Sequence, residues 1–257
     1  MTGLAAWTSD SLEMVRRNLI HIKRTPELLL DVTLTPVMFV LLFSFVFGGE
    51  IDIPGVDYTS FLMAGIFVQT IAFAGVYTSV LLANDLKNGM IDRFRSLPMA
   101  QSSVLFGRTF TDLMRALLAV AIMWIVGLLI GFRPEGSIGP TVVAIGLMLL
   151  FGFALSWIGV ALGSMVRTPE ALQGMIFAVV FPLTFVSSAF VRTETMPVWL
   201  AWFADRQPMT LVIDAVRDLT LNGEPGPAFV PAVLWSVVPL VVFVPLGLWL
   251  YNRRTTQ

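Results

Sequence analysis

Six long apolar stretches constrain the fold of this chain more than any other feature of its sequence. They lie near 28–47, 60–83, 109–131, 140–166, 170–191 and 228–251. Each has roughly the 20 residues that an α-helix needs to cross the hydrocarbon core of a bilayer. Because only 13% of the residues are charged and 56% are hydrophobic, the sequence predicts an all-α integral membrane protein with six transmembrane helices.

The first 27 residues are polar and charged, and they predict a helix on the membrane surface. Asp10 and Glu13 have the spacing of a capping box, and Pro26 ends the helix after Thr25. Four apolar side chains form a stripe beside basic residues, which is typical of an interfacial helix. The sequence here is not that of a cleavable signal peptide.

A charged segment, Asn84 to Arg108, lies between the second and third apolar stretches. Leu86, Met90 and Phe94 fall on one face at helical spacing, charged side chains occupy the rest of the surface, and Pro98 ends the helix. Such a helix either rests on lipid headgroups or presents its face to the groove of a soluble partner.

The distribution of Lys and Arg predicts the orientation. Of the 16 basic residues, 12 lie in the N-terminal segment, around 84–115, at Arg167 and in the tail, and 4 lie on the opposite side. The positive-inside rule then places both termini and the charged segment in the cytoplasm.

The segment before the last apolar stretch predicts two short external helices that dip back into the outer leaflet. The first, 197–204, carries Trp199 and Trp202 and is too short to span. The second, 208–221, ends at Asn222-Gly223 and places Asp214 and Arg217 three residues apart, where they can pair.

Several kinds of site have no support in the sequence. There is no cysteine, one histidine (His21) and no Gly-x-x-x-x-Gly-Lys-Ser/Thr loop, so catalytic residues, a metal site, a nucleic-acid partner and a cofactor bound to this chain are not expected. The apolar stretches contain few ionisable groups, chiefly Asp31 and the pair Asp112 and Arg115. A transporter driven by ions through Asp31 remains the alternative.

Small and polar residues inside the apolar stretches have two interpretations. In the second, fourth and fifth stretches they either permit close helix packing or line a path for a transported molecule. Pro36 and Pro182 lie inside the first and fifth stretches, where they can kink the helices.

The whole chain resembles the ABC-2 type exporter permeases, and within them the daunorubicin-resistance-like group. Residues 88–99, NGMIDRFRSLPM, are similar to the coupling-helix loop of that family. Gln207-Pro208-Met209-Thr210 with Asp214-Ala215-Val216-Arg217 is similar to the family segment Asn-Pro-Leu-Thr…Asp-Ala-Leu-Arg, with Gln207 in place of Asn.

The resemblance implies an organisation and a set of roles. The chain, 1–257, would be one transmembrane domain, made of a cytoplasmic interfacial helix (1–27), spans 1 and 2 (28–83), a cytoplasmic coupling loop (84–108), spans 3 to 5 (109–191), re-entrant external helices (192–227), and span 6 with the tail (228–257). Docking to the ATPase would use Asp85, Leu86, Gly89, Met90, Asp92, Arg93, Phe94, Arg95 and Leu97. The path would include Gln69, Thr70, Phe73, Tyr77, Phe177, Phe181, Thr184, Ser187 and Ser188. The external helices would contribute Trp199, Trp202, Pro208, Thr210, Asp214 and Arg217.

The resemblance also implies partners and a location. Two copies of a cytoplasmic ATPase carrying ATP and Mg would bind a pair of permease chains, most simply a homodimer, in the bacterial inner membrane. The cargo would be an amphipathic drug, lipid or lipid-linked glycan moved outward, and membrane lipids would surround the spans.

Overall fold

The computed structural model describes residues 27–48, 53, 55–87, 101–166 and 168–256, and in this part all regular structure is helical. The N-terminal interfacial helix and residues 88–100 of the charged segment lie outside the described residues. The long helices are α2 (Glu27–Leu42), continued by a π-helical turn (Phe43–Phe47), α3 (Tyr58–Lys87), α5 (Gln101–Ile130), α6 (Ile138–Met165), α7 (Pro169–Phe185) and α10 (Phe229–Thr256). The short elements are a 3-10 turn (Thr193–Thr195), α8 (Val198–Ala204), α9 (Pro208–Arg217) and a π-helical turn (Asp218–Asn222).

Four of these helices are long and apolar enough to cross a bilayer. They cover Tyr58–Asn84, Thr109–Ile130, Ile138–Met165 and Phe229–Tyr251, and two shorter apolar helices cover Leu34–Val46 and Pro169–Phe185. Large apolar side chains are exposed along the outer faces of α5, α7 and α10. Apolar surface of this extent indicates a membrane protein.

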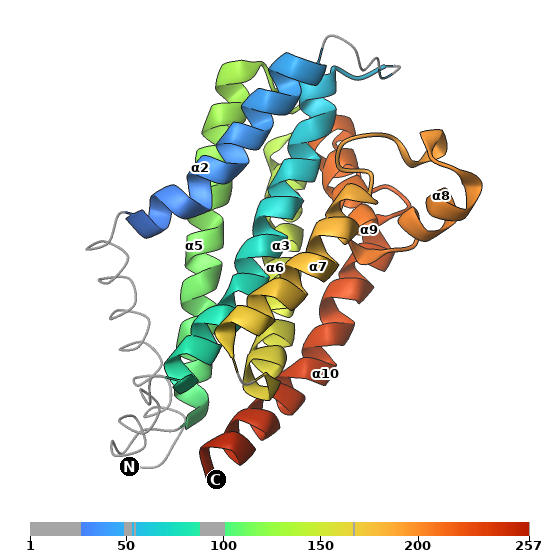
Figure 1. Ribbon diagram of the computed structural model, residues 1–257. Coiled ribbons are helices and arrows are strands. Elements are labelled where there is room, and N and C mark those ends of the chain that lie inside the picture. Colours follow the sequence, from blue (N-terminus) through green and yellow to red (C-terminus); the bar gives the residue numbers. More distant parts are fainter. Residues whose placement is uncertain (1–26, 49–52, 54, 88–100, 167, 257) are drawn as a thin grey trace.

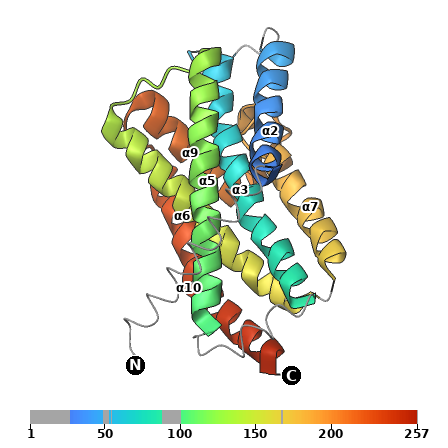
Figure 2. The same ribbon diagram turned by 90° about the vertical axis from the view of Figure 1, so that its left-hand side faces the viewer.

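The central helix of the bundle is α3. Its residues 60–72 are all buried, because α2, α5, α6, α7 and α9 pack around it, as Figures 1 and 2 show. The polar side chains of Gln69 and Thr70 are therefore held inside the protein rather than against lipid. Thr70 satisfies its hydroxyl within the helix, donating a hydrogen bond to the carbonyl of Ile66 at 2.7 Å.

Small residues bring α3 and α6 into backbone contact. A Cβ atom added to Gly75 would lie 2.7 Å from the carbonyl oxygen of Gly152, and one added to Gly163 would lie 2.7 Å from that of Ser79. Larger side chains at these positions would separate the helices. The packing interpretation is therefore confirmed for this pair of helices.

The fifth helix is shorter than the predicted stretch 170–191, because it ends at Phe185. Val186 leaves the helical conformation, and its N–H bonds the carbonyl of Pro182 at 2.8 Å. The amide of Gln207 donates hydrogen bonds to the carbonyls of Leu183, at 2.8 Å, and Val186, at 2.6 Å. A side chain from another segment thus satisfies carbonyls that the end of a helix leaves without donors.

The second short helix ends as predicted. Gly223 has a positive φ of 75°, and its N–H bonds the carbonyl of Asp218 at 3.0 Å. A glycine in this conformation is the common C-terminal stop of a helix.

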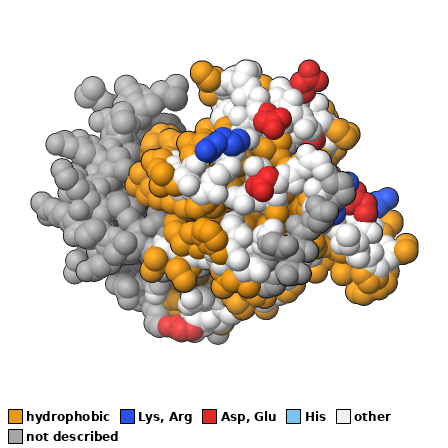
Figure 3. All heavy atoms as spheres, turned by 90° about the horizontal axis from the view of Figure 1, so that it is seen from above, with side chains coloured by type: hydrophobic (Ala, Val, Ile, Leu, Met, Phe, Trp, Pro, Cys, Tyr) orange, Lys and Arg blue, Asp and Glu red, His pale blue; other side chains and the backbone are white. Residues whose placement is uncertain are grey.

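Both short helices, α8 and α9, lie at the end of the bundle opposite the C-terminal end of α10 (Figure 1). We refer to this end as the α8–α9 end. Seen from there, acidic and basic side chains lie among hydrophobic ones on the face of the bundle (Figure 3).

Candidate functional site

The main apolar cavity lies between α2, α3, α5 and α7 and has a volume of about 300 Å³. Its lining residues are Thr35, Pro36, Phe39, Gln69, Thr70, Phe73, Ala74, Asp112, Arg115, Phe177 and Phe181. Most of this surface is aromatic or aliphatic, with a few polar groups. Cavities of this composition hold small amphipathic molecules, because the apolar wall buries the body of the ligand and the polar groups orient it.

Two polar atoms of this cavity are unmatched. The Oε1 of Gln69 and the Nε of Arg115 are buried, and neither has a hydrogen-bond partner in the described part of the structure. Gln69 is only 7% exposed. A buried polar group without a partner costs about 1–3 kcal/mol. Both atoms are enclosed by their neighbours, so a molecule in the cavity could supply the missing partners only after the two side chains turn toward it.

An ion pair forms one wall of the cavity. The guanidinium of Arg115 lies 3.3 Å from the carboxylate of Asp112, and both side chains are largely buried. The pairing predicted from their three-residue spacing on α5 is confirmed. The pair places two opposite charges beside the apolar wall without adding net charge to it.

Phenylalanine rings continue from the cavity toward the α8–α9 end. Phe181 lies 4.5 Å from Phe185, Phe185 5.0 Å from Phe190, and Phe190 4.5 Å from Phe43, measured between ring centroids. Phe43 in turn lies 6.0 Å from Phe39, which lines the cavity. We call this series the aromatic arch, because it begins and ends at the cavity and joins α7 to α2.

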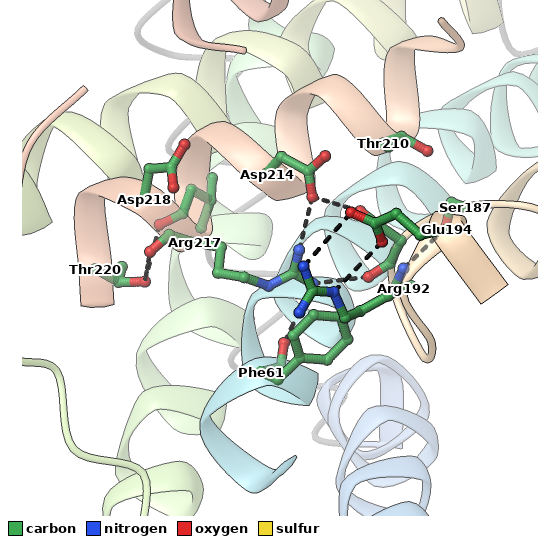
Figure 4. Close-up of polar contacts among 12 residues, drawn as sticks. Phe61, Ser187, Arg192, Glu194, Thr210, Asp214, Arg217, Asp218 and Thr220 are labelled. Atoms are coloured by element: carbon green, nitrogen blue, oxygen red, sulfur yellow. Dashed lines mark hydrogen bonds and ion pairs between the residues drawn. The ribbon is translucent and has the colours of Figure 1, made fainter. Parts of the chain in front are cut away.

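A polar network packs behind the arch and is centred on Arg217 of α9 (Figure 4). Its Nη1 donates to the carboxylate of Asp214 at 2.6 Å, and its Nη2 donates to the carbonyls of Ser188, at 2.7 Å, and Phe61, at 3.4 Å. The Ser188 hydroxyl donates to the same Asp214 oxygen at 2.6 Å. The pairing predicted for Asp214 and Arg217 is confirmed.

This network faces a second, more polar cleft of about 480 Å³ at the α8–α9 end, lined partly by Ser188, Asp214 and Arg217. Burial lowers the pKa of the Arg217 guanidinium to about 10, while the charge of Asp214 opposes this change, so Arg217 is cationic at neutral pH. Burial also raises the pKa of Asp218, and the neighbouring charge of Asp214 adds to the effect. No group of three or more potential metal ligands was found among the described residues.

The predicted path residues fall into two groups. Gln69, Thr70, Phe73, Phe177 and Phe181 line the main cavity together. Thr184, Ser187 and Ser188 do not line this cavity. Their hydroxyls make hydrogen bonds near the end of α7. Thr184 donates to the carbonyl of Val180, Ser187 to the carbonyl of Thr184, and Ser188 to the carboxylate of Asp214. The Tyr77 side chain lies outside the described residues.

The structure describes the remaining predicted site residues to different extents. Asp85 and Leu86 lie in the last turn of α3, without described side chains, and Gly89, Met90, Asp92, Arg93, Phe94, Arg95 and Leu97 are outside the described residues. Trp199 and Trp202 of α8 are 73% and 60% exposed. Pro208 begins α9, and Thr210 is buried and accepts a hydrogen bond from Gln207 at 3.4 Å.

Three lining residues of α2 (Thr35, Pro36 and Phe39) and Ala74 of α3 were not predicted as site residues. Pro36 was recognised only as a possible kink, and Asp112 and Arg115 only as an ion pair. Asp112 and Arg115 could have been identified as lining residues because they are charged residues in an apolar stretch, and such residues usually face the protein interior. The apolar residues of α2 gave no comparable signal.

Comparisons with known proteins show the family of the chain. Residues 11–221 match the family described as ABC-2 type transporter. The chain is 37% identical to the daunorubicin resistance ABC transporter permease protein DrrB1 of Streptomyces coeruleorubidus, over 98% of this chain and 89% of the relative. It is 28% identical to the putative transport permease ycf38 of Cyanophora paradoxa, over 80% and 72% of the two chains. It is 21% identical to the probable doxorubicin resistance ABC transporter permease protein DrrC of Mycobacterium tuberculosis, over 86% and 80%. The chain therefore belongs to the ABC-2 type transporter family of membrane permeases.

Proposed function

We propose that this permease is the transmembrane subunit of an exporter that moves an amphipathic molecule outward and takes its energy from ATP hydrolysed, with Mg, on a separate subunit. The observation that carries the proposal is the main cavity, whose lining combines phenylalanine rings with the polar side chains of Gln69 and Arg115 inside a chain of this family. An energy source on another chain agrees with the lack of a phosphate-binding loop in the sequence.

The lining of the cavity favours a substrate with a flat apolar body and a polar group. Phe177 and Phe181 offer ring faces against which an aromatic system can stack. Gln69 Oε1 can accept a hydrogen bond from the ligand, and Arg115 Nε can donate one. Relatives named for daunorubicin and doxorubicin resistance make a drug of this kind the first candidate, and lipids or lipid-linked glycans belong to the same amphipathic class.

We further propose six spans, with α2 and α7 as the shorter two, and both chain termini in the cytoplasm of a bacterial inner membrane. From Glu27 to Phe47 the first helix and its π-helical turn are long enough to cross about 30 Å of hydrocarbon. The α8–α9 end then faces outward. The exposed rings of Trp199 and Trp202 suit the outer interface of the bilayer, with α8 lying in the outer leaflet.

A second copy of the chain is the simplest partner for the exposed side of the cavity. Along α7 only Pro169, Leu172 and Thr184 are buried. Phe177 and Phe181 line the cavity and are also exposed at 57% and 37%. A homodimer that pairs these faces would enclose two cavities in one path between the chains.

The ATPase would dock on the coupling loop, residues 84–108. Its apolar stripe is suited to a groove on a soluble partner. Residues 84–87 of this loop form the end of α3 and residues 101–108 the start of α5, so docking there would connect the ATPase to the helix that contributes most to the cavity wall.

The test is purification of the permease from membranes in mild detergent, with identification of the chains that purify with it. Variants Phe94→Ala and Arg93→Ala are then assayed for ATPase turnover and for doxorubicin transport in vesicles. We expect these variants to release the ATPase or to uncouple its turnover from transport. Phe110→Ala, which removes an exposed ring on α5, is the control and should behave as the parent.

A permease that purifies without a nucleotide-binding partner, and that is unaffected by both substitutions, would contradict the proposal. Asp31→Asn tests the ion-driven alternative in the same vesicles. We expect doxorubicin transport by this variant to equal that of the parent, and a loss of transport would instead support ion coupling through this carboxyl group.

A further inference from the structure

The aromatic arch adjoins the main cavity on the side of the α8–α9 end, because Phe181 and Phe39 belong both to the arch and to the cavity lining. Phe185, Phe190 and Phe43 stack in sequence from α7 to α2, and Phe190 is only 6% exposed. The backbone at Phe190 is tied to α3, because the hydroxyl of Tyr58 donates to its carbonyl at 3.3 Å. On this side of the cavity, ring contacts therefore join α7, the segment after it and the π-helical turn that continues α2, and one hydrogen bond joins them to α3.

Close packing places the segment after α7 directly on α3. Gly65 faces the backbone of Ala189 so tightly that an added Cβ atom would overlap it. This contact fixes Ser188 and Phe190, on either side of Ala189, against the first turns of α3. Any opening of the arch must therefore move this segment away from α3.

Arg217 joins the same two elements from the other side. One nitrogen, Nη2, contacts the carbonyls of both Ser188 and Phe61, which belong to the segment after α7 and to α3. Asp214 fixes the position of the guanidinium and also accepts the hydrogen bond from the Ser188 hydroxyl. Moving Ser188 away from α3 thus breaks two charge-assisted hydrogen bonds at once.

We propose that Asp214 and Arg217 form a clamp that holds the aromatic arch closed, and that Ser188 must leave this clamp before the cavity opens to the outside. The inference rests on the proposed function, because export defines the outward direction. The polar cleft is lined by Ser188 and by both residues of the clamp, so water can replace the broken hydrogen bonds when the segment moves. That replacement makes the clamp releasable rather than permanent.

The experiment uses the absence of cysteine from the chain. A single cysteine is placed in the cavity by Ala74→Cys, and the full transporter is labelled in intact cells with a charged, membrane-impermeant methanethiosulfonate reagent. Ser188→Ala and Asp214→Asn are each added to this background. We expect both to speed labelling about tenfold, since Ser188→Ala removes a hydrogen bond to a charged group and Asp214→Asn replaces the charged acceptor with a neutral amide. Glu224→Gln removes one negative charge at an exposed position after α9 and should label at the parent rate.

A second measurement locks the arch instead of loosening it. Phe43→Cys with Phe190→Cys is bridged by a short bifunctional thiol reagent, and doxorubicin transport is measured before bridging, after it, and after reduction. We expect bridging to stop transport and reduction to restore it. Bridged protein that transports at the unbridged rate would overturn the inference.

The two measurements separate the clamp from the proposed function. If the parent transports doxorubicin and the clamp variants label no faster than the parent, the clamp is wrong and the exporter function stands. If the clamp variants label faster while the parent moves no doxorubicin, the clamp stands and the choice of substrate is wrong.

Discussion

The guanidinium of Arg217 lies over the ring of Phe61, with its central carbon 3.7 Å from the ring centroid. The contact joins α9 to the first turns of α3, and the Arg217 side chain is only 14% exposed. A second cation–π contact, between Arg206 and Trp202, has a separation of 4.8 Å and involves two exposed residues. The same type of contact therefore occurs in a buried and in an exposed setting.

Comparing these two contacts tests how burial changes the contribution of such an arginine to the free energy of unfolding. Arg217→Ala leaves the Asp214 carboxylate, which is 38% exposed, without its charged partner. It should lower the free energy of unfolding by about 1.5–3 kcal/mol, through the loss of hydrogen bonds that involve a charged group. Arg206→Ala should lower it by less than about 1 kcal/mol, because solvent screens the exposed pair. Thermal unfolding of both variants in the same detergent measures the difference, and equal losses would contradict the buried setting of Arg217.

Two glycines of α6 should respond in opposite ways to the same substitution. Gly163→Ala puts a methyl group 2.7 Å from a carbonyl oxygen of α3 and should destabilise the fold by about 1–3 kcal/mol. Gly146 has no atom within 4 Å of the added Cβ, and Gly146→Ala should be neutral or stabilising by up to about 1 kcal/mol. Unfolding curves of the two variants provide the measurement, and a neutral Gly163→Ala would show that α3 and α6 are not in backbone contact.

Substitution of Gln69 should affect transport but not stability. Gln69→Leu removes a buried oxygen that has no partner among the described residues, so the unfolding temperature should stay the same or rise. Doxorubicin transport should fall about tenfold in kcat/KM through loss of one hydrogen bond to the substrate. Thr70→Val is the control, since the Thr70 hydroxyl bonds within its own helix. A Gln69→Leu variant that is less stable but transports normally would assign Gln69 a purely structural role.

The raised pKa of Asp218 predicts a pH-dependent stability. A carboxyl group whose pKa is higher in the folded state binds more protons there than in the unfolded state. Its contribution to the stability of the fold is therefore fully present below the unfolded pKa of about 3.9, and it is lost as the pH rises through the folded pKa. Asp218→Asn should therefore unfold at a higher temperature than the parent at neutral pH, with the difference vanishing near pH 4.

The sequence was sufficient to predict the helices and two of the ion pairs, because both depend on local spacing. Apolar length fixes which residues can cross a bilayer, and residues three apart on a helix are neighbours in any fold. The end of α7 was predicted six residues too late because the residues after Phe185 are still mostly apolar and carry no charge before Arg192. What ends the helix is Gln207, a residue more than 20 positions away in the chain.

The lining of the cavity was predictable only in part, because it also depends on contacts between segments that are distant in the chain. Gln69 stands out as an amide in an apolar stretch, and that contrast indicates an inward-facing position. Phe39 has apolar neighbours along α2, so nothing in the sequence distinguishes the side that meets the cavity from the side that meets lipid. Only the packing of α2 against α3 and α5 decides it.

The length and composition of α3 have a mechanical consequence. Its 30 residues contain no proline, whereas α2, α7 and α10 each contain at least one. A helix of this length is about 45 Å long and bends little where its hydrogen-bond ladder is uninterrupted. It therefore acts as a rigid rod: a displacement of its Lys87 end reaches Gln69 and Phe61 in full, without an intermediate joint to absorb it.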